Sequence, residues 1–173
     1  MQIKYEDPQA VEEFIQSMAA DLKEKISKFD IDSVMMLGIH TGGYWVAEKL
    51  HQELQLPSTL GSLNISFYRD DFTNMGLHPE VKPSEIPHDI EDKHIILVDD
   101  VLYTGRTVRA ALNEIFDYGR PASVIFAALV DRNEQELPIC SEVTGVTINL
   151  SKGQQIKLSG PEPLVLKKIA EKE

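Results

Sequence analysis

The sequence predicts an α/β fold in which a parallel β-sheet is covered by helices on both faces. Three apolar runs, 33–39, 95–98 and 123–131, lack the polar alternation of a strand with one solvated face. Segments with helical spacing of apolar residues lie between these runs. Strands that alternate with helices in this way are typical of a parallel sheet. A central sheet flanked by helices is therefore the expected architecture.

The elements in the first part of the chain follow from apolar spacing and from capping residues. Asp7 and Pro8 have the form of an N-cap followed by a proline in the first turn, and the helix after them is expected to bury one face. The run 33–39 is expected to be a strand, residues 44–54 the next helix and residues 59–69 another strand.

The second part begins with a polar stretch, residues 70–93, which holds three prolines and shows no periodicity. A loop of this length is usually functional or disordered. After the next strand, a helix from about residue 105 is expected to end at Gly119. The remaining expected elements are a strand at 123–131, short strands within 142–150 and 154–160, and a C-terminal helix within 163–173.

Length and composition favour one soluble globular domain. The chain has 173 residues, enough for a hydrophobic core, and 42% of them are hydrophobic. No apolar run approaches the roughly 18–20 residues that span a bilayer, and the N-terminus lacks a signal-peptide pattern. The single cysteine, Cys140, excludes an intrachain disulfide and a Cys-rich zinc site. A cytoplasmic protein is expected, and the net charge of −11 argues against nucleic-acid binding.

The stretch HIILVDDVLYTGRT, residues 94–107, carries the strongest chemical signal. A buried strand ends on Asp99 and Asp100, and ligands of open parallel sheets bind beyond the carboxyl ends of the strands. Residues 104–107 then open a helix, where free backbone N–H groups favour an anion and Gly105 allows close approach. Carboxylates can accept hydrogen bonds from sugar hydroxyl groups, and the adjacent loop can bind a phosphate. This combination suits a ribose 5-phosphate. A solvated strand end followed by a helix cap is the simpler alternative, and it explains less of this combination.

Neither a Walker loop nor a G-x-G-x-x-G fingerprint is present, whereas the stretch closely resembles the phosphoribosyl diphosphate (PRPP) motif of type I phosphoribosyltransferases. Together with YRDD, GRP and LVDR…ELPI, it resembles the PyrR family of pyrimidine-operon regulators and uracil phosphoribosyltransferases over about residues 34–148. The resemblance implies one phosphoribosyltransferase domain over residues 1–173 and a homo-oligomer, a dimer or larger. Its parts would be a core at about 1–131, a mobile lid at about 70–90 and a small C-terminal hood at about 132–160.

The resemblance also assigns roles to individual residues. Thr41, Gly42 and Gly43 would present backbone N–H groups to the diphosphate, after a cis peptide at His40–Thr41; a plain strand-to-helix turn is the alternative. Arg69 would clamp pyrophosphate. The catalytic residues would be Arg69, Asp99 and Asp100, and the last two would help to hold Mg²⁺, mostly through PRPP and water. The residues expected to bind PRPP or UMP are Thr41, Gly42, Gly43, Asp99, Asp100, Tyr103, Thr104, Gly105, Arg106 and Thr107.

The base pocket implied by the resemblance consists of Asp131, Leu137 and Ile139. Tyr103 and Asp131 stand where enzymes for 6-oxopurines carry an acid and a lysine, so both argue against a 6-oxopurine and agree with uracil. The expected reaction converts uracil and PRPP to UMP and pyrophosphate with Mg²⁺. The sequence offers no convincing general base for the nucleobase N–H.

Regulatory members of the PyrR family also bind attenuator RNA through a basic face. In this chain Glu134, Gln135, Cys140 and Val146 stand where that family typically has His, Arg, Arg and Lys. Loss of several cations weakens phosphate binding steeply, so RNA is the less favoured partner. Two alternatives stay open: a nucleotide-sensing RNA-binding regulator with weak or no transferase activity, and a phosphoribosyltransferase for another base.

Overall fold

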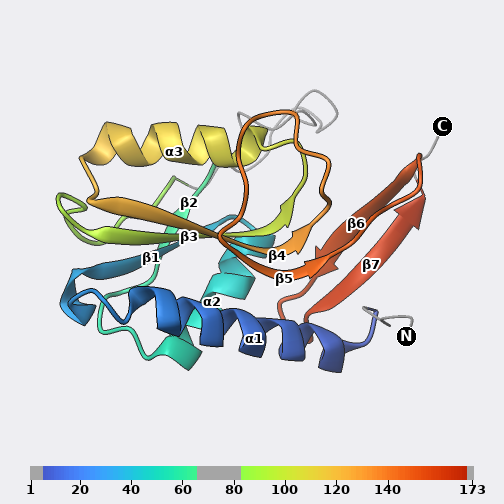
Figure 1. Cartoon of the computed structure of the whole chain (residues 1–173), viewed down its shortest axis with the longest axis horizontal. Helices are drawn as coiled ribbons and strands as arrows, with labels where there is room; N and C mark the ends of the chain where they lie inside the picture. The colour runs from blue at the N-terminus through green and yellow to red at the C-terminus, as the bar shows by residue number, and fades with distance from the viewer. Residues whose placement is uncertain (1–5, 66–82, 171–173) are drawn as a thin grey trace.

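The computed structural model describes residues 6–65 and 83–170, which form a five-stranded sheet with helices on both faces and a separate two-stranded hairpin (Figure 1). The helices are α1 (Pro8–Ile26), α2 (Gly42–Leu54) and α3 (Arg106–Tyr118), and a 3-10 turn spans Ile31–Ser33. The strands are β1 (Val34–Ile39), β2 (Gly61–Leu63), β3 (His94–Leu102), β4 (Ser123–Asp131), β5 (Val143–Thr147), β6 (Gln154–Ser159) and β7 (Val165–Ala170). Within the described residues, no helix is long and apolar enough to cross a membrane.

The central sheet has the strand order β2-β1-β3-β4-β5, and every neighbouring pair is parallel. Helix α2 follows β1 and helix α3 follows β3, as parallel neighbours require a crossover connection. The register places Met36 beside Ile96 and Ile96 beside Ile125, so the three longest apolar runs lie next to one another. The expected α/β fold is confirmed.

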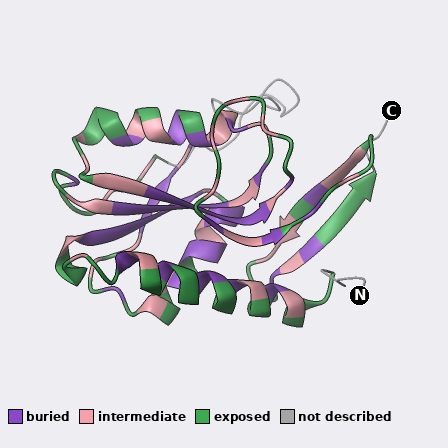
Figure 2. Cartoon of the chain, viewed as in Figure 1, coloured by how far each residue is buried: buried purple, intermediate pink, exposed green. Residues whose placement is uncertain are grey.

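The two faces of the sheet bury different residues of the same strands. Met35 and Leu37 belong to the core under α3, whereas Val34 and Met36 belong to the core shared with α1 and α2. Figure 1 shows α3 on one face of the sheet and α1 and α2 on the other, and Figure 2 shows the strands between them as buried. Because both faces are covered, the strands read as continuous apolar runs. In α3, Phe116 is exposed, whereas Val108, Ala111 and Ile115 are buried.

The predicted C-terminal helix is wrong, because its residues form β7 instead. Strand β7 pairs antiparallel with β6, and Leu166, which lies opposite Leu158, is fully buried. The other pairs in this hairpin include Lys157 opposite Lys167. Tertiary pairing of apolar residues outweighs the helix propensity of a lysine-rich segment.

The hairpin is attached to helix α2. A methyl group added at Gly160 would lie 2.7 Å from the ring of Trp45, so the tryptophan packs directly on the chain between β6 and β7. Lys49 donates to Glu162 at 3.1 Å. These contacts fix the hairpin beside the carboxyl ends of β1 and β3.

The segment after β2 lies partly outside the described residues. The strand expected at 59–69 is a short β2 in its described part, and the expected lid is described only from residue 83. There Glu85 exchanges two backbone hydrogen bonds of 2.8 Å with Ser62, and Ile90 is buried. Residues 83–90 are therefore fixed against the edge of the sheet.

Candidate active site

A pocket of about 410 Å³ lies at the carboxyl ends of β1, β3 and β4. It is lined by residues at the end of β3, at the start of α3, at the start of α2 and in β6, together with Arg132. The lining residues are Thr41, Gly42, Trp45, Asp99, Asp100, Val101, Leu102, Tyr103, Thr104, Gly105, Thr107, Val108, Arg132, Gln155, Ile156, Lys157 and Leu158. The structure therefore brings together most of the residues predicted to bind PRPP.

Asp99 and Asp100, the acid pair, occupy different environments. The side chain of Asp99 is 1% exposed, and its Oδ1 accepts the backbone N–H of Asp100 at 2.9 Å. Asp100 is half-buried, and its Oδ1 accepts the N–H of Val101 at 3.1 Å. Each carboxylate has one oxygen fixed by the adjacent backbone. Because a carboxylate has two acceptor oxygens, Asp100 keeps acceptor capacity at the pocket.

Residues 40–43, the glycine loop, lie directly against the acid pair. A methyl group added at Gly42 would lie 2.6 Å from Cγ of Asp100, and one added at Gly43 would lie 2.8 Å from Cα of Asp99. Only glycine leaves space for this approach. The peptide between His40 and Thr41 is cis, as expected from the resemblance.

Two helix N-termini face the same pocket. Helix α2 begins at Gly42, and its N-cap residue makes no side-chain hydrogen bond to the first turn in the described structure; helix α3 begins at Arg106, whose N–H donates to Oγ1 of Thr104 at 3.3 Å. The first backbone N–H groups of a helix have no intrahelical partner, and the helix dipole makes this end positive. Two such ends in one pocket suit a ligand with two anionic groups.

Residues 104–107, the anion loop, are supported by the β4–β5 connection, residues 132–142. The carbonyl oxygen of Thr104 accepts the N–H of Glu136 at 3.0 Å and that of Leu137 at 3.2 Å. Gly105 has a φ of 93°, a left-handed conformation that favours glycine. The Arg106 guanidinium also pairs with the carboxylate of Glu136. The conformation of the anion loop therefore depends on the β4–β5 connection.

Tyr103 and Arg132 form a stacked pair in the lining of the pocket. Cζ of Arg132 lies 3.8 Å from the centre of the Tyr103 ring, which is a cation–π geometry. The backbone N–H of Arg132 donates to the carbonyl of Leu102 at 3.0 Å, which places the start of the β4–β5 connection beside the end of β3. Nη2 of Arg132 donates to both carboxylate oxygens of Glu134, at 3.2 and 3.1 Å.

The three residues predicted for the base pocket lie beside the site and are not part of the described lining. Asp131 Oδ1 accepts the N–H of Asn133 at 2.7 Å and the side-chain amide of Gln135 at 2.6 Å, so this carboxylate organises the β4–β5 connection. A methyl group added at Gly105 would lie 3.4 Å from Cβ of Leu137 and 3.5 Å from Cβ of Ile139, so both side chains lie beside this glycine. Their role in base recognition stays a prediction, and Arg69 lies outside the described residues.

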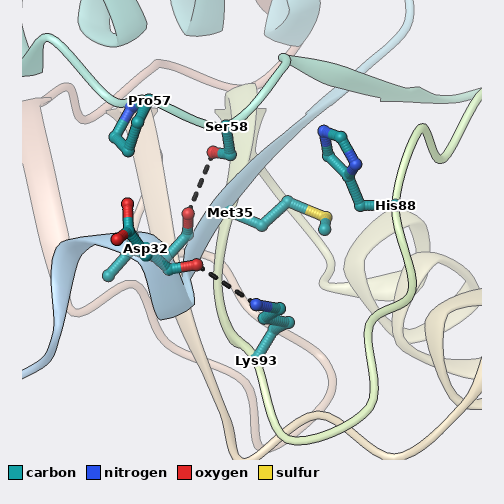
Figure 3. Close-up of a pocket in the computed structure, with 7 residues that line it drawn as sticks. Asp32, Met35, Pro57, Ser58, His88 and Lys93 are labelled. Atoms are coloured by element: carbon teal, nitrogen blue, oxygen red, sulfur yellow. Dashed lines mark hydrogen bonds between the residues drawn. The ribbon is translucent and has the colours of Figure 1, made fainter.

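A second hollow, of about 270 Å³, lies at the opposite end of the sheet, where β1 begins (Figure 3). Ser58 Oγ donates to the carbonyl of Val34 at 2.9 Å, and Lys93 Nζ donates to the carbonyl of Asp32 at 3.1 Å. Ligands of parallel sheets bind at the carboxyl ends of the strands, so this hollow is not the expected position of the reaction.

Comparison with known proteins identifies the family of this chain. Residues 2–159 match the family model described as "Phosphoribosyl transferase domain". A relative from Pseudomonas syringae pv. tomato, called "Bifunctional protein PyrR", is 57% identical over 154 residues, which cover 89% of this chain and 91% of the relative. A relative of the same name from Nitrosococcus oceani is 54% identical, over 89% of this chain and 88% of the relative. The chain belongs to the PyrR family of type I phosphoribosyltransferases.

Solved structures of the same fold are more distant in sequence. A hypoxanthine-guanine phosphoribosyltransferase from Bacillus anthracis is 17% identical, with a TM-score of 0.66 over 83% of this chain and 81% of that one. A hypoxanthine phosphoribosyltransferase from Staphylococcus aureus gives a TM-score of 0.64 at 17% identity, over 83% of this chain and 76% of that one. At this identity the likeness concerns the fold alone, and it confirms the type I phosphoribosyltransferase fold.

Within this family fold, sequence reasoning missed the contribution of β6. Gln155 and Lys157 line the pocket, and Trp45 joins them from α2. The sequence indicates a strand at 154–160 but contains no signal for where that strand lies. The packing of the chain at Gly160 on Trp45 brings β6 to the site.

Tyr44, on the same helix as Trp45, stacks on His40 with ring centres 4.9 Å apart. Burial raises the pKa of the Tyr44 hydroxyl, and the nearby charges of Glu48 and Glu85 raise it further. Tyr44 therefore remains a neutral hydrogen-bonding group beside the glycine loop at physiological pH.

No group of three or more His, Cys, Asp or Glu side chains in the described part of the chain could hold a metal ion by itself. The acid pair offers two carboxylates, and oxygen ligands are those that Mg²⁺ prefers. Mg²⁺ commonly binds through one or two carboxylates together with substrate phosphates and water. The donor set therefore fits an ion that arrives with an anionic ligand.

Proposed function

We propose that this protein transfers the phosphoribosyl group of PRPP to uracil, which gives UMP and pyrophosphate. The observation that carries the proposal is the meeting of the acid pair with two helix N-termini in one pocket. PRPP has an anionic group at each end of a sugar that carries hydroxyl groups, so its chemistry matches this arrangement. The family name shared with relatives that are 52–57% identical supports uracil as the base.

The anion loop would hold the 5-phosphate, and the glycine loop would hold the diphosphate. Backbone N–H groups at the starts of α3 and α2 would donate to these groups, with Thr104 and Thr107 as further donors. Arg69 remains a proposed clamp for pyrophosphate. Asp100, with its remaining carboxylate oxygen, would accept from a ribose hydroxyl between the two anionic groups.

The proposed reaction needs no covalent bond between the protein and the substrate. As the bond to pyrophosphate breaks, positive charge develops on the sugar, and the partly buried acid pair is positioned to stabilise it. Mg²⁺ would be held by Asp99 or Asp100 together with PRPP oxygens, and it would neutralise negative charge on the leaving group. Holding both reactants in one orientation supplies much of the remaining rate enhancement.

An RNA-binding regulator is the second candidate, because the relatives are called bifunctional. Two features of the β4–β5 connection favour the transferase. Glu136 pairs with Arg106 and Glu134 pairs with Arg132, so acids of this segment neutralise two arginines. A surface for the RNA backbone needs cations that are free to contact phosphates. We also propose a homo-oligomer, as the family resemblance implies.

Pyrophosphate release from PRPP and Mg²⁺, with each nucleobase supplied singly, tests the proposal. We expect turnover with uracil, and a loss of at least about 100-fold in kcat for Asp100→Asn, because the amide cannot stabilise positive charge. Turnover only with a purine would overturn the assignment of the base. No turnover with any base, together with binding of a pyrimidine leader RNA at low salt, would favour the regulator.

A further inference from the structure

Arg132 is a buried arginine that pairs with Glu134 but keeps one hydrogen-bond donor, its Nε–H, unsatisfied in the described part of the chain. The residue is only 8% exposed, although arginine is seldom buried without full pairing. In the described part of the chain its Nε–H has no hydrogen-bond acceptor, and the guanidinium bonds that the structure contains both leave from Nη2. An unsatisfied buried donor costs free energy. Retaining one in the lining of a pocket suggests that a ligand supplies the missing acceptor.

The partner of Arg132 must be an acceptor, because a guanidinium carries only donors. Glu134 accepts from the outer nitrogen, but its own side chain is 39% exposed, so water also solvates this carboxylate. The Tyr103 ring lies against the guanidinium, with Cζ 3.8 Å from the ring centre, and helps to hold it in place. A guanidinium donates only within its own plane. Such a donor selects an acceptor by direction as well as by charge.

The position of Arg132 in the sheet indicates which part of a ligand it would meet. The sheet order places β3 between β1 and β4, so the glycine loop after β1 and Arg132 after β4 lie on opposite sides of the acid pair. The helix N-termini of α2 and α3 already provide for two anionic groups. What remains of a ribonucleotide is its base, and the nearby walls of the pocket include the Tyr103 ring and the apolar Val101 and Leu102.

We propose that Arg132, oriented by its stack on Tyr103, donates a hydrogen bond to an exocyclic carbonyl oxygen of the base. This inference rests on the proposed function, because it takes the ligand to be a pyrimidine ribonucleotide. It goes further by assigning base recognition to a side chain of the β4–β5 connection. Asp131 then orders the β4–β5 connection through Asn133 and Gln135, and Leu137 and Ile139 hold it beside Gly105.

The test compares binding of UMP with binding of ribose 5-phosphate, which lacks only the base. Calorimetry on wild type, Arg132→Met and Arg132→Lys gives both affinities for each protein. Arg109→Met is the matched control, because Arg109 is exposed on α3 and is not part of the described pocket lining. We expect Arg132→Met to lower the affinity for UMP by about tenfold or more, because a charged hydrogen bond is lost. The affinity for ribose 5-phosphate should stay within about twofold of the wild-type value. The control variant should change the affinity for neither ligand.

An equal loss of affinity for both ligands in Arg132→Met would overturn the inference, because it would indicate a phosphate contact or a structural role. Unchanged UMP binding would overturn it as well. If Arg132→Met does not fold, Arg132→Lys decides by the same comparison, since lysine keeps the charge but not the planar donors. Failure of the wild type to bind either ligand would instead refute the proposed function. Uracil turnover by the wild type tests that function separately.

Discussion

Substitution of Gly42 by alanine tests whether the glycine loop and the acid pair work as one unit. The added methyl carbon would lie 2.6 Å from Cγ and 3.0 Å from Cβ of Asp100, and closer still to Oδ2. Non-bonded carbon atoms pack at about 3.5–4.0 Å, so the carboxylate or the loop must move by about 1 Å. Overpacking of this kind typically costs about 1–3 kcal/mol of stability.

The effect on activity should exceed the effect on stability. A displacement of about 1 Å at a reacting centre can reduce the rate about 100-fold, so we expect a loss of this order in kcat/KM for PRPP. The free energy of unfolding from urea titration and kcat/KM from pyrophosphate release are the two measurements. A Gly42→Ala protein with wild-type kcat/KM would refute the reasoning.

A double-mutant cycle separates the clash with Asp100 from a general effect on the loop. In an Asp100→Ala background the carboxylate is absent, so Gly42→Ala should cost about 1 kcal/mol less stability than in wild type. Gly43→Ala is the matched contrast, because its methyl group would meet the backbone of Val98 and Asp99 at 2.7 and 2.8 Å. Its cost should be the same in both backgrounds. Equal coupling for both glycines would contradict the explanation.

Two further predictions concern the surroundings of the pocket. Lys157→Gln should raise KM for PRPP about two- to fivefold at low salt, because the exposed Lys157 ammonium lines the pocket. Lys167 lies opposite Lys157 on β7 and is not part of the described lining, so Lys167→Gln should leave KM unchanged. Since the pKa of Tyr44 is raised in the folded state, the stability that its neutral hydroxyl contributes is present below pH 10 and falls as pH rises further. Tyr44→Phe should therefore flatten the decline in unfolding free energy as the pH rises above 10, measured in urea; an unchanged slope would contradict the raised pKa.

The central strands and the PRPP motif could be predicted because their signals are local. Residues 34–39, 95–98 and 125–130 are buried, so their sequences contain no polar side chains. The position of Asp99 and Asp100 at a carboxyl strand end then follows from the α/β pattern.

The remaining features depend on contacts between distant segments. Residues 165–170 have no strong strand signal of their own, and their pairing with β6 decides their conformation. The place of Lys157 in the pocket depends on Trp45, which is more than 100 residues away in the chain. The hydrogen bonds from Asn133 and Gln135 to the Asp131 carboxylate likewise depend on the backbone conformation of a turn, which the local sequence pattern does not indicate.

The hydrogen bonds from Glu136 and Leu137 to the carbonyl of Thr104 have a consequence for binding kinetics. A phosphate loop that is ordered only by its ligand loses conformational entropy at each binding event, which weakens affinity and slows association. Here the anion loop is already ordered by bonds to the protein itself. The entropy is lost once, when the chain folds, and each incoming ligand meets a preorganised loop. Weakening the hydrogen bonds to the Thr104 carbonyl should therefore lower the association rate of a phosphate ligand, even if every atom that contacts the phosphate is unchanged.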